Sequence, residues 1–211
     1  MENVFIGRNI EYAPNNDYPF KDNPEFYGNS AFYKQEYLKS VTISVSVTKI
    51  LPYLFKDCKH LNDLTINGAL TEIPERAFDA CNIISLVLPN TVEEISTSAF
   101  MDNANMKSAS LGNSVKVIGD NAFSGCTTLS EINLGTNLEK IGNGAFRSVG
   151  LLAMSWKPFV LPESLVSIGN NAFRGSGITS MTIPNHVRFV GESCFAESKN
   201  LKSVTMGSGC Q

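Results

Sequence analysis

The side chains best suited to chemistry in this sequence are five cysteines, two histidines and scattered carboxylates. The cysteines are not spaced as a zinc site, because no C-x-x-C occurs. His60 and His186 are not related by any repeat, and the sequence has no H-E-x-x-H, G-x-S-x-G or phosphate-loop motif. The pair Glu93-Glu94 is better explained as a solvated corner than as an acid/base dyad. We therefore expect a non-enzymatic protein with no metal site and no cofactor.

Three cysteines share one spacing: Cys58, Cys81 and Cys126 each follow a phenylalanine by three residues. Free cysteine behaves as a small buried hydrophobe, so buried thiols are the favoured interpretation for these three and for Cys194. A disulfide between Cys58 and Cys81 stays open as an alternative, since it needs only favourable Cβ directions on neighbouring repeats. Cys210, near the end, is expected to be exposed.

The phenylalanines that set this spacing recur along the whole chain, 22 to 27 residues apart. They are Phe32, Phe55, Phe78, Phe100, Phe123, Phe146, Phe173 and Phe195. Around Phe123 the chain reads V-x-x-I-G-x-x-A-F-x-x-C-x-x-L-x-x-I-x-L-G, and the other copies vary this template. A fixed period in this range indicates a solenoid. Each unit is too short to bury its own apolar residues, so the copies must stack and turn their apolar columns into continuous ladders.

The I-x-L group alternates apolar and polar residues, which is typical of a strand with one buried face. The period predicts nine parallel strands, about 4.8 Å apart. They begin at Val4, Val41, Leu64, Leu86, Ala109, Ile132, Phe159, Met181 and Val204. The A-F-x-x-C segment lacks alternation and is expected to form a turn or a short helical turn on the far side of the coil.

The template resembles the leucine-rich repeats of the bacterial surface antigen A type (BspA-like), which also occur in treponemal and protozoan surface proteins. The resemblance covers residues 38–206 strongly, and Val4-Phe5-Ile6-Gly7 looks like the end of one more repeat. It implies an α/β leucine-rich-repeat solenoid: a right-handed coil with a parallel β-sheet face, mostly β with short helical or 3₁₀ turns. It also implies a non-enzymatic cell-surface module for adhesion and protein binding.

We expect one array over residues 1–211. Residues 1–37 would be a partial repeat with an irregular capping loop, 38–206 the regular repeats and 207–211 a tail. Three prolines and clustered Asn and Asp give residues 8–31 a loop composition, and we interpret this segment as a cap over the first repeats. The last strand then has poorer cover, which predicts end-to-end self-association.

A 27-residue interval separates Phe146 from Phe173, and the extra residues lie between Ala153 and Pro158. They include the only tryptophan, Trp156. Two interpretations remain open: a bulge whose tryptophan packs back onto the coil, or an exposed tip that binds a ligand. In the second case the candidate binding residues are Trp156, Lys157 and Phe159, since tryptophan is common at binding hot spots.

The outward strand residues form a second candidate surface, rich in Ser and Thr and poor in charge. Its representatives are Thr65, Ser110, Asn133 and Thr182. Ser and Thr also suit any exposed strand. The resemblance implies binding on this sheet, with a protein ligand such as a host matrix or cell-surface protein. The alternative is a rigid spacer or stalk within a larger surface protein.

A net charge of −3, with 18% charged residues, argues against nucleic acid as a partner. No run of 18 apolar residues exists, so we expect no membrane span. Residues 1–30 lack an apolar signal core. We expect a cell-surface or secreted protein whose signal peptide lies outside this sequence, or a cytoplasmic one if Met1 is the native start.

Overall fold

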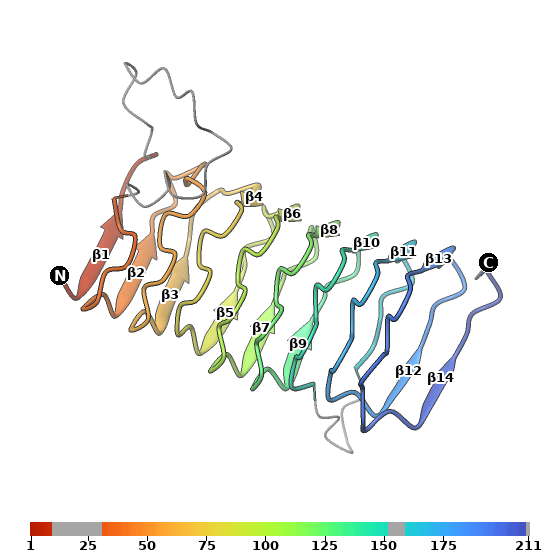
Figure 1. Ribbon diagram of the computed structural model, residues 1–211. Helices are drawn as coiled ribbons and strands as arrows, with labels where there is room; N and C mark the ends of the chain where they lie inside the picture. Colours follow the sequence, from red (N-terminus) through yellow and green to blue (C-terminus); the bar gives the residue numbers. More distant parts are fainter. Residues whose placement is uncertain (10–30, 152–158, 210–211) are drawn as a thin grey trace, which may run out of the picture.

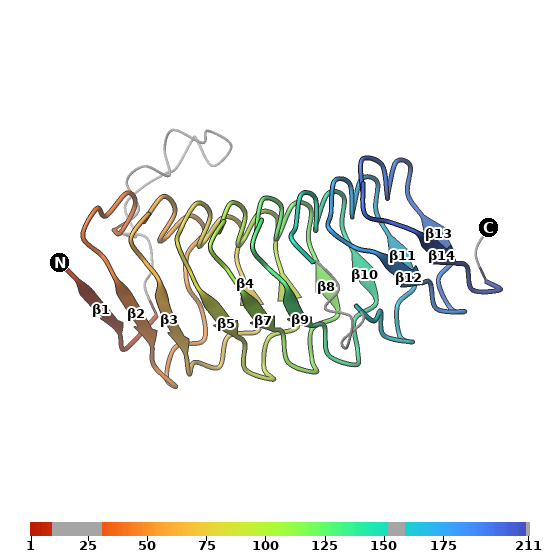
Figure 2. The ribbon, with the colours of Figure 1, turned by 90° about the horizontal axis from the view of Figure 1, so that it is seen from below.

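The computed structural model describes residues 1–9, 31–151 and 159–209. The chain winds into a β-solenoid of about seven turns with parallel sheets, which confirms the predicted coil (Figure 1). The N-terminus lies at one end and the C-terminus at the other, and the turns stack along one axis in both views (Figure 2). We call each turn a rung and name it by its phenylalanine.

The I-x-L groups form the strands of one side, which we call the strand face. These strands are β1 (Asn3–Ile6), β2 (Ser40–Ile43), β3 (Asp63–Ile66), β5 (Ser85–Val87), β7 (Ser108–Ser110), β9 (Glu131–Asn133), β12 (Ser180–Thr182) and β14 (Ser203–Thr205). They make three parallel sheets, with orders β1-β2-β3, β5-β7-β9 and β12-β14. Val41 pairs with Leu64, so the inward residues of successive rungs face one another. Eight of the nine predicted strands are therefore confirmed, each beginning one residue earlier than expected.

The ninth prediction, a strand at Phe159, is wrong: Phe159 and Val160 carry no strand, and the strand face is interrupted between β9 and β12. The other rungs place an aliphatic side chain at this inward position, whereas Phe159 brings an aromatic ring. That ring lies edge-on to Phe146 and Phe173, with centroid distances of 6.4 and 5.6 Å. The strand face is thus interrupted at this rung, as it also is between β3 and β5.

A second side of the coil carries a sheet that the alternation did not predict. Its strands are β4 (Glu72–Ile73), β6 (Glu94–Ile95), β8 (Val117–Ile118), β10 (Lys140–Ile141), β11 (Ser167–Ile168) and β13 (Phe189–Val190), in the order β4-β6-β8-β10-β11-β13. Two residues are too few to show an alternating pattern. From β8 onward a glycine follows each of these strands and lets the rungs approach closely, because a Cβ at Gly142 would lie 2.6 Å from the backbone nitrogen of Asp120.

On the third side, the A-F segment forms a turn rather than a helical turn. Around Phe123 the backbone has positive φ at Asn121 (55°) and Gly125 (78°), and the other rungs from Phe55 to Phe195 repeat this at the same two positions. Alternate N–H groups donate to the next rung, as from Phe123 to the Ala145 carbonyl at 2.9 Å. A helix would use these donors internally. The turn therefore adds a third ladder of hydrogen bonds between rungs.

The phenylalanines form the predicted buried ladder. Neighbouring rings from Phe32 to Phe195 stack with centroids 5.2 to 6.0 Å apart and interplanar angles of 13° or less. The six rings from Phe55 to Phe173 are fully buried, whereas Phe195 in the last rung is only partly covered. Burial of large aromatic side chains in this continuous core accounts for much of the stability of the coil.

Candidate functional site

The cysteine column is structural. The thiols of Cys58, Cys81 and Cys126 each donate to the phenylalanine carbonyl of the preceding rung, at 2.9, 3.1 and 3.3 Å. These thiols and Cys194 are free and buried, so the disulfide alternative for Cys58 and Cys81 is wrong. Burial raises the pKa of Cys126 to about 12. Thiolate chemistry is therefore suppressed in this column.

A buried carboxylate joins two rungs on the turn side. Asp79 is 2% exposed and accepts from Lys56 Nζ at 2.8 Å and from Arg76 Nη1 at 2.7 Å. Burial by itself would lower the pKa of Lys56, but the hydrogen bond and charge of Asp79 raise it overall. Both cations are satisfied by this contact, so the cluster stabilises the turns rather than offering a site. The repeat template did not predict it, because these charged residues vary between copies.

Within the part of the chain that the structure describes, no group of three or more His, Cys, Asp or Glu side chains could hold a metal ion. Over the same residues, no helix is long and apolar enough to cross a membrane.

The predicted residues of the strand face all point outward. Thr65 on β3, Asn133 on β9 and Thr182 on β12 are exposed, and Ser110 on β7 is half-buried. Only Ser110 and Asn133 are cross-strand partners; Thr65 and Thr182 lie in the other two sheets. The Asn133 side chain already accepts from the Gly135 N–H at 3.0 Å. The strand face is therefore a polar surface divided into three parts, not one continuous sheet.

The interruption of the strand face brings two predicted residues together. Phe159 and Thr182 line a hollow of about 210 Å³. The remaining lining residues are Val160, Leu161, Glu163, Ser180, Met181 and Pro184. Val160 is 69% exposed, whereas Phe159 is half-buried against the core. Trp156 and Lys157, the other two candidates of the insertion, lie outside the described residues. The hollow combines apolar carbon, hydroxyls and one carboxylate, a composition suited to a protein side chain.

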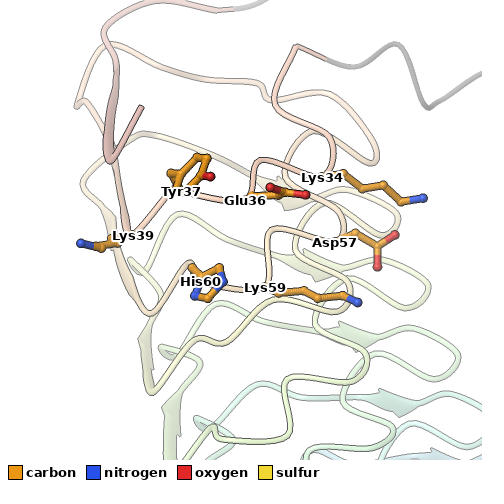
Figure 3. A pocket seen from close by; sticks show the side chains of 7 residues that line it. All are labelled: Lys34, Glu36, Tyr37, Lys39, Asp57, Lys59 and His60. Carbon is orange, nitrogen blue, oxygen red and sulfur yellow. The ribbon is translucent and has the colours of Figure 1, made fainter.

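A larger cavity of about 530 Å³ lies at the N-terminal end, at the corner between the phenylalanine turn and the strand face (Figure 3). Its described lining residues are Lys34, Glu36, Tyr37, Lys39, Asp57, Lys59 and His60. We call this set the charged corner. None of these residues is among the binding residues predicted from the sequence. Most of them do occupy the same positions of two consecutive repeats, which is a pattern that the sequence contains.

The repeat structure also decides the family. The family model of the BspA type leucine rich repeat region matches residues 25–153 and 153–211, in six copies. The chain belongs to this family. The resemblance inferred from the phenylalanine and isoleucine columns is thus confirmed.

Solved structures support the BspA-type fold. A leucine-rich repeat protein from Bacteroides ovatus aligns with a TM-score of 0.59 and 23% identity over 84% of this chain and 57% of its own. A leucine rich cell surface protein from Faecalibacterium prausnitzii aligns with a TM-score of 0.54 and 24% identity over 80% of this chain and 39% of its own. The leucine rich repeat protein of T. pallidum has a TM-score of 0.52 and 35% identity, covering 57% of each chain.

This BspA-type chain therefore spans only 39% to 57% of the length of these solved proteins. No curated protein matches it. The similarity to the first two structures, both below 25% identity, concerns the fold alone.

Proposed function

We propose that this chain is a non-enzymatic binding module of a cell-surface or secreted protein. Its ligand would be a protein, such as a host matrix or cell-surface protein, held by the strand face beside the insertion. The observation that carries the proposal is the hollow between Phe159 and Thr182, since Phe159 follows Trp156 and Lys157 closely in the sequence. A large aromatic anchor beside a partly apolar hollow with a polar surround is typical of a binding hot spot.

Three features of the strand face support this proposal. Its outward side chains are short and mostly uncharged, so little side-chain entropy is lost on binding. Two hydroxyls of neighbouring strands, those of Ser85 and Ser108, are within hydrogen-bonding distance, with their oxygens 3.0 Å apart. Three ladders of contacts between rungs hold the backbone, so the surface is pre-organised. Such a surface favours many modest polar contacts around one or two aromatic anchors.

The test is binding of the isolated chain to immobilised laminin, collagen and fibronectin, measured by surface plasmon resonance. Thr182→Lys places a long charged side chain at the rim of the hollow and should weaken binding about tenfold, through a clash and an unpaired charge. Thr42→Lys is the matched control, because Thr42 holds the corresponding outward position on β2. The control should leave binding unchanged.

Trp156 gives a second readout of the same site. It is the only tryptophan, so its emission reports on the insertion alone. In the free protein, iodide should quench this emission, and ligand should protect it. Equal loss of affinity in Thr182→Lys and Thr42→Lys, or emission that does not respond to bound ligand, would contradict a site at the insertion.

A rigid spacer is the second candidate function. The observation that favours it is the unbroken phenylalanine ladder, which makes the coil a stiff rod from Phe32 to Phe195. A spacer would bind none of the immobilised proteins, and Trp156 would report no ligand. The same experiment therefore distinguishes the two functions.

The C-terminal rung supports a further part of the proposal, end-to-end association with a second copy. Phe195 and Val204 are only partly covered, in contrast with the fully buried residues of the central rungs. In each rung from Phe55 to Phe173 the phenylalanine N–H donates forward, and no described residue accepts from Phe195. An apolar edge with open donors can pair with another chain. Sedimentation velocity in reducing buffer should show concentration-dependent association, and a strictly monomeric protein would exclude it.

A further inference from the structure

The charged corner is built from two consecutive rungs. Lys34, Glu36 and Tyr37 lie in the rung of Phe32, and Asp57, Lys59 and His60 occupy the same positions after Phe55. Figure 3 shows the two groups on successive turns of the backbone, around one cavity of about 530 Å³. This volume lies within the range of small-molecule sites.

Opposite charges face each other across these rungs, yet they do not pair. The described ion pairs do not include Lys34 with Asp57 or Glu36 with Lys59. Lys34 instead lies over the Tyr33 ring, 4.9 Å from its centroid. Asp57 contacts Lys56 of its own turn, at 3.5 Å. Among the described residues, Glu36 and Lys59 therefore have no charged partner.

The remaining lining residues are only lightly constrained. Lys39 pairs with Glu2 at 3.0 Å, in an exposed contact that contributes little. Tyr37 is 70% exposed, and no described residue bonds to its hydroxyl. The corner thus presents ammonium groups, a free carboxylate and an aromatic ring to solvent.

The central rungs show that the coil does not need such side chains here. At the same corner they carry Asn82, Asn105 and Thr128, which are smaller and bonded to the protein itself. Asn105 Nδ2 donates to Asn82 Oδ1 at 2.6 Å, and Thr128 Oγ1 donates to the Ala104 carbonyl at 2.8 Å. In contrast to these central rungs, the first two rungs carry long charged side chains and an exposed aromatic ring here, and Glu36 and Lys59 have no charged partner among the described residues. Groups that the repeat neither requires nor satisfies are available to a ligand.

We propose that the charged corner binds an acidic sugar, such as a uronic or sialic acid unit at the end of a glycan. The Lys59 ammonium pairs with the sugar carboxylate, with Lys34 as a second positive charge. The Glu36 carboxylate accepts hydrogen bonds from the sugar hydroxyls. The exposed Tyr37 ring packs against the apolar face of the sugar ring. The site lies at the N-terminal end, far along the coil from the insertion, and is independent of the protein-binding surface.

The mixture of charges favours an acidic sugar over an acidic peptide. A run of carboxylates on a peptide would approach Glu36 and Asp57 and be repelled. A sugar with one carboxylate and several hydroxyls needs both positive groups and acceptors, and the corner supplies both. A neutral sugar leaves the ammonium groups without a counter-charge and should bind more weakly.

The experiment is a titration of the full chain, followed by NMR chemical shifts, with glucuronic acid and N-acetylneuraminic acid. Glucose and a hexa-aspartate peptide are the comparison ligands. We expect saturable binding of at least one acidic sugar, with a dissociation constant of about 1 mM or below. Glucose should bind at least about tenfold more weakly, and higher salt should weaken binding of the acidic sugar.

Three variants locate the site. Lys59→Gln should weaken binding of the acidic sugar about tenfold, because a charge-assisted contact is lost. Tyr37→Ala should weaken binding of acidic and neutral sugars alike, whereas Lys59→Gln should affect binding of the acidic sugar only. Lys199→Gln is the matched control, because Lys199 follows Phe195 by four residues as Lys59 follows Phe55. All three positions are exposed, so the fold is retained.

Four outcomes would overturn the proposal. They are no binding of either acidic sugar at about 10 mM, equal binding of glucose, equal effects of Lys59→Gln and Lys199→Gln, or binding of the peptide without the sugars. The Thr182→Lys variant should bind the sugar normally, so failure here is distinguishable from failure of the protein-binding proposal.

Discussion

The rungs of Phe123 and Phe146 show what the coil requires and what it leaves free. In the rung of Phe123, the strand face, the second sheet and the phenylalanine turn all pair with the next rung or the one before. After Phe146, 27 residues separate the phenylalanines, yet the Phe146 and Phe173 rings still stack at 5.4 Å and Ile141 still pairs with Ile168. Among the described residues of this interval, only the strand face is interrupted. Two of the three sides are therefore enough to keep the rungs in register.

The polar contacts of those two sides explain why the insertion is tolerated. Asn143 Oδ1 accepts from the Asn170 N–H at 2.8 Å, across the long interval. The corresponding bond from Asn143 N–H to Asp120 Oδ1 spans a regular interval at 2.7 Å. The ladder is thus unaffected by the extra residues, which in the sequence come just before the strand-face position of Phe159. The change in repeat length therefore falls where the ladder does not depend on it.

The largest expected effect on stability is the difference between Phe123, in the regular rung, and Phe159, in the rung that carries the insertion. Phe123→Ala should lower the free energy of unfolding by about 3–5 kcal/mol, because the ring is fully buried in the ladder. Phe159→Ala should cost about half as much, since its ring is half-buried beside the hollow. Urea denaturation followed by circular dichroism measures both. Equal costs would mean that the interrupted rung is as tightly packed as the regular one.

The next effect concerns buried polar groups. Asn103 is fully buried; its Oδ1 accepts from the Ile83 N–H at 3.1 Å, and its Nδ2 donates to the Phe78 carbonyl at 2.8 Å. Asn103→Ala should cost about 2–3 kcal/mol, because it leaves both backbone groups unpaired. Ser180→Ala, at the exposed rim of the hollow, should be nearly neutral. The same urea titrations measure both variants. If Asn103→Ala left the free energy of unfolding unchanged, the two hydrogen bonds of Asn103 would not contribute to stability.

A smaller effect depends on pH. Burial raises the pKa of Cys126 from its ordinary 9.0 to about 12. The unfolded thiol ionises first, so this contribution to stability is complete below about pH 9 and is lost as pH rises toward 12. Cys126→Val mimics Val149, which holds this position in the rung of Phe146. Between pH 8 and 10 the wild type should lose about 1 kcal/mol more than the variant. If the wild type and the variant lost the same stability between pH 8 and 10, Cys126 would not contribute to the pH dependence.

The smallest expected effect is that of Trp156→Ala on stability. If the insertion lies outside the ladder, this change should leave the melting temperature within about 1 °C of the wild type, because surface changes are close to neutral. Differential scanning calorimetry measures it. A loss of several kcal/mol, as for a buried aromatic residue, would show that the tryptophan packs onto the coil and is structural.

Much of the fold could be predicted because each repeat places the same side chains at the same positions. The phenylalanine ladder, eight strands and their outward residues followed from that period. The second sheet did not, because its strands have two residues each and leave no alternation to detect. The strand at Phe159 failed because the period says nothing about how an aromatic ring packs at one inward position. Of the candidate residues that the structure describes, only Phe159 and Thr182 meet in one hollow.

By itself, the sequence determined a stack of rungs with one column of apolar side chains per apolar template position. Each repeat is too short to bury these side chains alone, so they are buried only when the repeats stack in register. Tertiary structure alone decided which side carries the interruption and which varying side chains become neighbours. Lys34, Glu36 and Tyr37 meet Lys59 and His60 only because two rungs lie side by side. A template records what every rung shares, and these side chains belong to single rungs. Their partners, and the open space between them, exist only once the coil is wound.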